Sequence, residues 1–425
     1  MTAATNDTRT QTGPWGGGAR LLDFGLRGRE TAGPCDGAHI LEAADALLER
    51  ADGPGMLASL EDVLASGRDR WPLEAQLAVK LARSRQILLR ETRPGHVSIV
   101  VPLYGEHRRM LHPEEDPVGE DFIGRKLAQL DWLFRDAPGL GYDLLLVDDG
   151  CPHASGRLAE ERLARLHPGA PARVLFLRDA IAEHLPVAAG LRDVDDSRKG
   201  GAVEYGMWTA AQEPRPRHVI AYTDADLSTH LGQLGLLLEP VWRRGLDVAV
   251  GSRRERCSFS VKSGARSDRG LMFIYLWKRL LPDLRYLLDT QCGFKAFRAD
   301  RVPTLVSGSL EKGFAFDIEL LLRAERTRTH SIEPVPIAWI DSESASTTTQ
   351  LRPYLGMLKS VVRLYRAYLS ADPDAERFAR AIESLDEARW DRLVGNVPAE
   401  LSGADPARFP GLFPQCDGKI LSALH

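Results

Sequence analysis

The chain is predicted to be an α/β protein with a mainly parallel sheet flanked by helices, on two observations. Short apolar runs, typical of strands buried on both faces, alternate with helical segments between residues 97 and 222. Several of these runs end in acidic or turn-forming residues, and ligands collect at the carboxyl ends of parallel strands. The alternation therefore predicts both the fold class and the edge of the sheet that holds a site.

The first strand is predicted at Val97–Val101, a short, mainly apolar run that Pro102 stops. The same pattern predicts strands at 142–147, 173–177 and 219–222, and helices between them at 127–134, 155–166 and 201–211. Beyond residue 226 the pattern loosens and predicts a strand at 247–250 and helices at 271–281 and 316–326. The segment 332–340 contains two prolines and is predicted to be an edge strand.

Four regions are predicted along the chain: a disordered terminus at 1–20, a helical extension at 21–92, the α/β domain at 93–350 and a second helical extension at 351–425. Apolar residues recur at helical spacing within 40–48, 56–64 and 73–89. Packing, dimerisation or a lid are the roles open to this first extension. The second is predicted to be helical to about residue 396 and loop-like after it.

Composition excludes several classes of protein. With 425 residues, 44% of them hydrophobic, and a net charge of −4, the chain has neither the basic excess of a general nucleic-acid binder nor that of an anionic-membrane binder. The five cysteines are scattered, which favours reduced thiols over a zinc site or a disulfide framework. No apolar run approaches the roughly 20 residues of a membrane-spanning helix. A cytoplasmic protein without integral membrane contact is therefore predicted.

Two acidic motifs follow predicted strands. Asp148 and Asp149 precede Gly150, and Asp224 is separated from Asp226 by one residue. Carboxylates are costly to bury without a partner, and two on one turn can share a hard cation that also binds a diphosphate. The motifs favour chemistry on a nucleotide-activated substrate. Turn formation or helix capping by these residues is the alternative.

Taken in order, these motifs resemble an inverting glycosyltransferase of family 2, which has the Rossmann-like GT-A fold. The matching segments are 97–106 (first nucleotide-binding strand), 144–151 ("VDDGS"), 197–206 ("KGxAxxxG"), 222–226 (Asp-x-Asp) and 250–253 ("GSR"). Two later segments, 289–298 and 314–321, are similar to the dolichyl- and polyprenyl-phosphate sugar synthase branch. Members of that branch commonly carry membrane anchors, which this sequence does not show.

The resemblance implies a role for residues of the donor site. It implies that Asp226 binds Mg²⁺ or Mn²⁺, with Asp224 near the ribose or the same ion. The nucleotide would be bound by Asp148, Asp149, Pro102, Tyr104 and Glu106, with Tyr104 able to stack on the base. Lys199 and Arg253 would face the diphosphate, although Lys199 in its polar loop could equally be a solvated lysine.

On the acceptor side, the resemblance places the candidate general base at Asp317, with Asp289 as the second candidate. A hydroxyl acceptor needs its proton removed as it attacks, whereas an acceptor that is already anionic does not. Helix capping is the alternative role for Asp317. Gly293 and Phe294 are predicted to shape the wall on the acceptor side.

The sequence thus predicts a metal-dependent inverting transferase that moves a sugar from a UDP- or GDP-linked donor to a soluble small-molecule acceptor, in specialised (antibiotic) metabolism for example. A polyprenyl phosphate reached at the membrane surface is the alternative acceptor. A nucleotidyltransferase, or a non-catalytic nucleotide-sugar sensor that need not keep Asp317, are alternatives of other classes.

Overall fold

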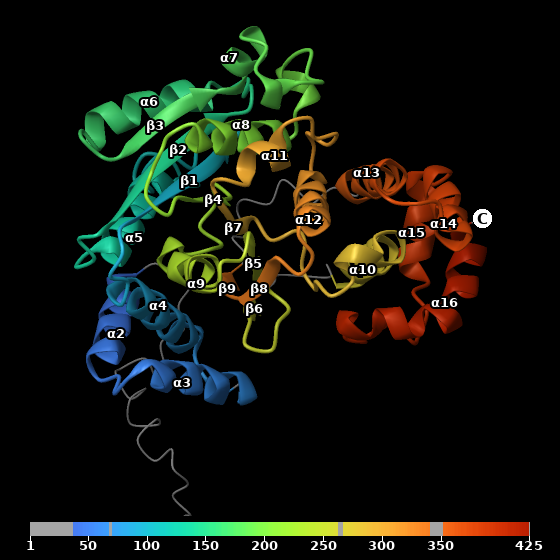
Figure 1. The fold of residues 1–425 in the computed structure, drawn as a ribbon, viewed down its shortest axis with the longest axis horizontal. Coiled ribbons are helices and arrows are strands. Elements are labelled where there is room, and N and C mark those ends of the chain that lie inside the picture. The colour runs from blue at the N-terminus through green and yellow to red at the C-terminus, as the bar shows by residue number, and fades with distance from the viewer. Residues whose placement is uncertain (1–36, 68–69, 262–266, 341–351, 425) are drawn as a thin grey trace, which may run out of the picture.

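A computed structural model of the chain describes residues 37–67, 70–261, 267–340 and 352–424. Its centre is a seven-stranded sheet in the order β3-β2-β1-β4-β7-β5-β8 (Figure 1). The strands are β1 Gly95–Leu103, β2 Leu140–Asp148, β3 Ala172–Phe176, β4 Val219–Thr223, β5 Val248–Ser252, β7 Phe294–Arg298 and β8 Ile332–Pro336. Only β7 runs antiparallel to its neighbours in this sheet, so the predicted α/β class with a mainly parallel mixed sheet is confirmed.

Helices cover both faces of the sheet. They are α2 Ala38–Glu49, α3 Pro54–Ser66, α4 Leu73–Leu89, α5 Phe122–Phe134, α6 Ser155–Leu166, α7 Leu177–Ala182, α8 Gly200–Ala211, α9 Leu234–Arg244, α10 Ser267–Leu280, α11 Val302–Val306, α12 Phe316–Thr327, α13 Arg352–Tyr368, α14 Pro373–Glu383, α15 Glu387–Gly395 and α16 Phe409–Leu424. Short 3₁₀ turns are η2 Pro186–Ala188, η3 Val194–Asp196, η4 Leu231–Gln233, η5 Pro282–Leu284 and η7 Pro406–Arg408. Alternate residues of β1 belong to different cores. Ile99 belongs to the cluster that includes apolar residues of α4, α5 and α9, and Val100 to the cluster that includes those of α8 and α12.

The amino-terminal helices share a core with the sheet. Most of the 17 residues of α4 are buried, and its apolar side chains pack in the same cluster as those of β1 and α9. The backbones of α4 and α9 approach closely at Gly235, where an added Cβ would lie 2.3 Å from the carbonyl oxygen of Ser84. The amide of Gly235 donates to Ser84 Oγ at 2.9 Å. The segment 73–89 is therefore a wall of the α/β layer.

The carboxyl-terminal helices α13–α16 gather with α10 beside the sheet (Figure 1). The prediction of a loop-like segment after residue 396 is correct for residues 397–405 but wrong beyond them, because α16 is a helix of 16 residues despite Pro414 inside it. Its buried face includes Phe409 and Phe413, whose rings contact Tyr275 of α10 at centroid distances of 5.9 and 5.2 Å. Tertiary burial outweighs the helix-breaking residues that the local pattern emphasises.

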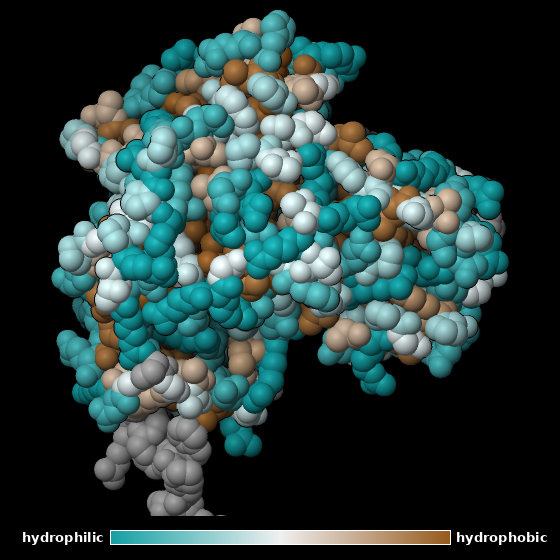
Figure 2. Space-filling view, viewed as in Figure 1, coloured by the Kyte–Doolittle hydropathy of each residue, from teal (hydrophilic) through white to brown (hydrophobic). Residues whose placement is uncertain are grey.

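The predicted helices and strands are found with boundaries that shift by a few residues. The segment 332–340 divides into β8, which is an edge strand, and β9 Ala338–Ile340, which pairs with β6 Phe259–Val261 in a separate sheet. The terminus predicted to be disordered lies outside the described residues. Among the described helices, none combines the length and apolar character needed to cross a bilayer. The face seen in Figure 2 is mostly hydrophilic, with apolar side chains in scattered patches.

Candidate functional site

The carboxyl ends of β1, β2 and β4 meet at one edge of the sheet. The parallel register pairs Leu103 of β1 with Asp148 of β2, and β4 lies on the other side of β1. The turns that follow β1 and β2 are also tied to each other, since the amide of Gly105 donates to Cys151 Sγ at 3.2 Å. The predicted nucleotide motifs are thus neighbours in space.

Asp148 is committed to its own turn. One carboxylate oxygen accepts from the amides of Gly150 and Cys151 at 3.0 and 3.2 Å, and the other accepts from Gly156 at 2.8 Å. These bonds order the turn and the start of α6, which is the structural alternative considered for this residue. A direct contact between Asp148 and a nucleotide stays a prediction.

Asp149 is buried but only half satisfied. Its Oδ2 accepts from the amide of Lys199 at 2.7 Å. Oδ1 is buried and, among the described residues, accepts no hydrogen bond of good geometry, although the Ser197 side chain is near enough to affect the pKa. Burial raises the pKa of Asp149 to about 6, against the opposing effect of its hydrogen bonds. An unpaired buried carboxylate oxygen at this edge is suited to a ligand's N–H or O–H donor.

Replacement of Asp149 by asparagine is expected to stabilise the fold at alkaline pH. Because the pKa is raised, the folded state holds the proton more tightly than the unfolded state, so wild-type stability falls as pH rises through about 6. The variant lacks this penalty and should gain on the order of 2 kcal/mol at pH 8, and less at pH 5. Urea unfolding at both pH values measures the difference. Asp148→Asn, which weakens three backbone bonds, should instead destabilise. A wild type and an Asp149→Asn variant with the same pH dependence would contradict this prediction.

Lys199 links the β2 turn to the β4 turn. It precedes α8 with a positive φ of 86°, an uncommon conformation for a residue with a Cβ. Its amide binds Asp149 and its ammonium forms an ion pair with Asp224. Gly293 makes room for Asp224, because a Cβ at that position would lie 2.2 Å from Asp224 Oδ2. The structure therefore brings Asp149 and Asp224 to one site through a single lysine.

Asp226 and Glu106 complete an acidic group with Asp224. Asp226 Oδ1 accepts from the amide of Ser228 at 3.1 Å, so this residue also caps its turn. Burial raises the pKa of Glu106, and the charges of Asp226 and Asp224 raise it further, while Arg109 opposes both. Asp226 and Glu106 therefore lie within electrostatic reach of each other, although they belong to the ends of different strands.

Two cations of this group have no counterpart in the sequence predictions. Arg109 Nε donates to Glu106 at 2.8 Å. Lys126 of α5 is fully buried, and its ammonium donates to the backbone carbonyl of Asp226 at 2.8 Å. Burial lowers the pKa of Lys126 to about 8, while the negative charges of Asp226 and Asp224 oppose the decrease. Nothing in the local sequence separates Lys126 from a solvent-facing helical lysine.

The oxygen ligands at this site suit a hard cation, but they are few. Carboxylate oxygens are the ligands that Mg²⁺ and Mn²⁺ prefer, and Asp224 and Asp226 offer them on one turn. Among the described residues, no group of three or more His, Cys, Asp or Glu side chains is arranged to hold a metal ion. The protein alone therefore offers fewer ligands than the six that Mg²⁺ requires.

Asp317, at the start of α12, lies next to a buried lysine. Lys295 Nζ donates to Asp317 Oδ1 at 2.9 Å, to Tyr222 Oη at 2.9 Å and to the carbonyl of Cys292 at 2.6 Å. Burial raises the pKa of Asp317 to about 8, against the attraction of Lys199, and burial lowers the pKa of Lys295 to about 7. Whether the shared proton is on Lys295 Nζ or on Asp317 Oδ1, the pair as a whole has no net negative charge.

The pairing of Asp289 argues against a catalytic role. Its two oxygens accept from Arg253 Nε and Nη2 at 2.6 and 2.8 Å, and one also accepts from the Arg253 amide at 3.1 Å. Burial alone would raise the pKa of Asp289, but the guanidinium outweighs it and holds the pKa well below its usual range. A carboxylate held this way is a poor base. It fixes Arg253, whose guanidinium also stacks over Trp339 at 5.3 Å.

The other predicted residues differ in what they present. Tyr104 directly follows β1 and is 50% exposed, so a flat ligand could stack on its ring. Pro102 is buried within β1. Phe294 is fully buried in the core, which argues against its predicted place in an acceptor wall. Gly293 acts through Asp224, as described above.

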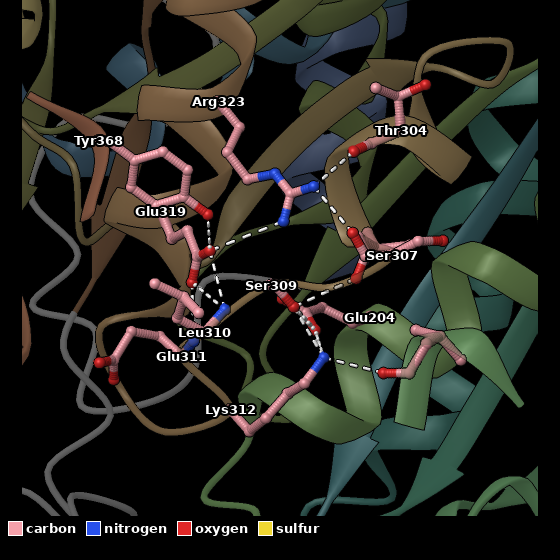
Figure 3. Close-up of polar contacts among 12 residues, drawn as sticks. Glu204, Thr304, Ser307, Ser309, Leu310, Glu311, Lys312, Glu319, Arg323 and Tyr368 are labelled. Atoms are coloured by element: carbon pink, nitrogen blue, oxygen red, sulfur yellow. Dashed lines mark hydrogen bonds and ion pairs between the residues drawn. The ribbon is translucent and has the colours of Figure 1, made fainter. Parts of the chain in front are cut away.

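A buried polar network joins the start of α8 to the segment before α12 (Figure 3). Lys312 Nζ donates to Glu204 Oε2 at 2.5 Å and to Ser309 Oγ at 2.7 Å. The backbone carbonyl of Lys312 accepts from the amides of Arg198 and Gly201 at 3.0 and 3.2 Å. The backbone on either side of Lys199 is therefore attached to the segment that leads to Asp317.

The same segment is attached to α12 and α13. Glu319 accepts from the amides of Leu310 and Glu311 at 2.8 and 2.7 Å, and Tyr368 of α13 donates to Glu319 at 2.5 Å (Figure 3). Sequence reasoning missed this role of Glu319, since the hydrogen-bond donors just named come from 8 to 49 positions away. The carboxyl-terminal helices thereby support the position of Asp317.

No protein-family model matches the chain, whereas curated proteins do. It is 26% identical over 279 residues to a dolichyl-phosphate β-glucosyltransferase of Drosophila melanogaster, covering 64% of this chain and 75% of that protein. It is 29% identical over 284 residues to the enzyme of the same name in Saccharomyces cerevisiae, with coverage of 64% and 75%. Among solved structures, glucosyl-3-phosphoglycerate synthase of Mycobacterium tuberculosis aligns over 71% of this chain and 86% of its own, with 17% identity and a TM-score of 0.44. The chain is a glycosyltransferase similar to the dolichyl-phosphate β-glucosyltransferases, as its motifs indicate.

Proposed function

We propose that this glycosyltransferase moves a sugar from a UDP- or GDP-linked donor to the phosphate of a polyprenyl lipid. The observation that supports the donor site is the buried Oδ1 of Asp149, an oxygen without a hydrogen bond in the described part of the chain, while Oδ2 of the same residue accepts from the Lys199 amide. In the proposed complex Oδ1 accepts an N–H of the nucleotide base, and Tyr104 stacks on the base. Lys199 then faces the diphosphate, and Arg253, held by Asp289, supports it.

A divalent cation is part of this proposal. Asp226 and Asp224 would hold Mg²⁺ or Mn²⁺, whose charge offsets the charge that develops on the departing diphosphate. The protein's own residues orient the donor around this position: Gly293 leaves room for Asp224, and Lys126 fixes the backbone of Asp226.

The Asp317–Lys295 pair favours a phosphate acceptor over a hydroxyl acceptor. A base for a hydroxyl needs a carboxylate that is available to take the proton, yet Asp317 Oδ1 already accepts from the buried ammonium of Lys295 at 2.9 Å. A phosphate needs no base, and a pair without net negative charge does not repel it. The relatives named above have dolichyl phosphate in their names, which supports the same acceptor class. The soluble small-molecule acceptor predicted from sequence is the second candidate.

Transfer assays with the full chain test this function. UDP- and GDP-sugars are supplied with Mg²⁺ or Mn²⁺, and either a short-chain polyprenyl phosphate or the matching polyprenol is offered as acceptor. The expected result is a lipid-phosphate-linked sugar from the phosphate and none from the alcohol. Product from the alcohol alone would replace the proposal with a hydroxyl acceptor.

Donor binding is expected to depend on Asp226. One nucleoside diphosphate, with metal, should raise the melting temperature of the wild type by mass action, and Asp226→Ala should abolish the increase. Differential scanning fluorimetry measures both, with Asp300→Ala, an exposed carboxylate paired with Arg298, as the matched control. The donor site is disproved if no nucleoside diphosphate stabilises the wild type.

A further inference from the structure

Each residue of the acidic group has a cation of the protein nearby, although only two of the three carboxylates are bonded to theirs. The group consists of Glu106, Asp224 and Asp226. Arg109 donates to the first, Lys199 forms an ion pair with the second, and Lys126 donates to the backbone carbonyl of the third. A free divalent ion entering this group therefore meets a site whose negative charge is largely balanced.

Lys126 lies fully buried beneath the acidic turn and bonds its backbone. Its side chain is fully buried on α5, where an ammonium is costly unless nearby charges offset the loss of water. Asp226 and Asp224 provide that offset electrostatically, while the hydrogen bond goes to a neutral carbonyl oxygen. Because Lys126 is enclosed, its amino group stays beneath the acidic turn whether or not a ligand is bound.

The small number of metal ligands that the protein offers also suggests that a metal ion needs the diphosphate in order to bind. In the described part of the chain, no three or more His, Cys, Asp or Glu side chains are arranged around a metal position. Mg²⁺ is commonly held by one or two carboxylates together with substrate phosphates. A diphosphate supplies the missing oxygen ligands. It also supplies negative charge for the lysines, which without it balance the charge of the carboxylates.

We propose that Lys126 and Lys199 are internal counter-cations that make divalent metal binding conditional on the diphosphate of the donor. This rests on the donor site proposed above. When a metal–diphosphate complex binds, Lys199 would exchange Asp224 for a phosphate oxygen. When a metal ion arrives without the diphosphate, the positive charges of Lys199 and of the enclosed Lys126 would repel it. By linkage, metal must strengthen diphosphate binding by the same factor.

Titration calorimetry with Mn²⁺ tests the proposal, with and without saturating UDP or GDP. The wild type is expected to bind Mn²⁺ at least about tenfold more tightly with one of these nucleotides, on the scale of a single charge removed from beside a divalent ion. Lys126→Met should bind Mn²⁺ alone about tenfold more tightly than the wild type, so the coupling shrinks. Lys199→Met should act in the same direction.

Lys278→Met is the matched control. Lys278 is also a fully buried lysine that donates to backbone carbonyls, those of Arg285 and Leu287, but it belongs to α10. Its loss should leave the coupling unchanged.

Equal Mn²⁺ affinity of the wild type with and without the nucleotide that binds would overturn the proposal. Lys126→Met and Lys199→Met variants that bind Mn²⁺ alone like the wild type would do the same. If Lys126→Met does not fold, the wild type and Lys199→Met decide. Failure of the donor site itself looks different, because then neither nucleotide binds the wild type in the presence of metal.

Discussion

Replacement of Gly293 by alanine is expected to lower the turnover of sugar transfer by at least about 100-fold, the scale of a misplaced active-site group. The new Cβ would lie 2.2 Å from Oδ2 and 2.7 Å from Oδ1 of Asp224, distances that require the carboxylate to move. The amide of Asp224 is held by the carbonyl of Gly293 at 3.2 Å, so the two backbones cannot easily separate. The loss should therefore fall on Asp224 and on the diphosphate and metal that it is proposed to position.

The measurement is steady-state transfer together with circular dichroism, which reports whether the fold persists. Gly356→Ala in α13 is the control, since an added Cβ there meets nothing within 4 Å. That change should leave transfer intact and stabilise the helix slightly. A Gly293→Ala enzyme that is folded and retains most of its turnover would show that the position of Asp224 does not limit the reaction.

Replacement of Lys295 by methionine is expected to destabilise the fold by about 3–5 kcal/mol, the typical result of removing one partner from a buried ion pair. Lys295 is fully enclosed in β7, and its loss leaves Asp317, Tyr222 and the Cys292 carbonyl without their shared donor. Urea unfolding followed by fluorescence gives the free energy of unfolding.

A second variant separates loss of the pair from loss of packing. Lys295→Met combined with Asp317→Asn removes both charges, and the double variant should recover part of the stability lost by the single one. A double variant that is as unstable as the sum of its two single variants would show that the two side chains contribute independently. A single variant that costs less than about 1 kcal/mol would mean that the buried pair contributes little.

The periodicity of apolar residues predicts the strands and helices of the α/β domain well, because these elements follow local rules. The strands at 97–101 and 142–147 are mostly apolar, with Ser98 and Asp143 as the exceptions, so burial on both faces suits them. In the structure, residues 97–101 and 144–147 are buried. The same rules fail at α16, whose prolines and glycines favour a loop. Contact with Tyr275 of α10, more than 130 positions away, decides that segment, and no local window contains it.

The residues of the site also divide into those that local motifs predict and those that depend on distant contacts. Motif order places Asp149, Asp224 and Asp226 at one edge of the sheet, where the structure has them. It does not foresee Lys126 or Lys312, because a lysine's burial depends on which distant elements enclose it. Lys295 offered a signal, since a charged residue inside an apolar strand must have a buried partner.

The way α4 is built into the sheet bears on how the chain matures during synthesis. Residues 73–89 emerge from the ribosome early, but they pack on α9 and near β9, which ends at Ile340. Until translation reaches that strand, one side of the helix has no final partner, and exposed apolar surface of this kind favours misassembly. Folding assistance by chaperones is therefore expected to act on the nascent chain until β9 has been made.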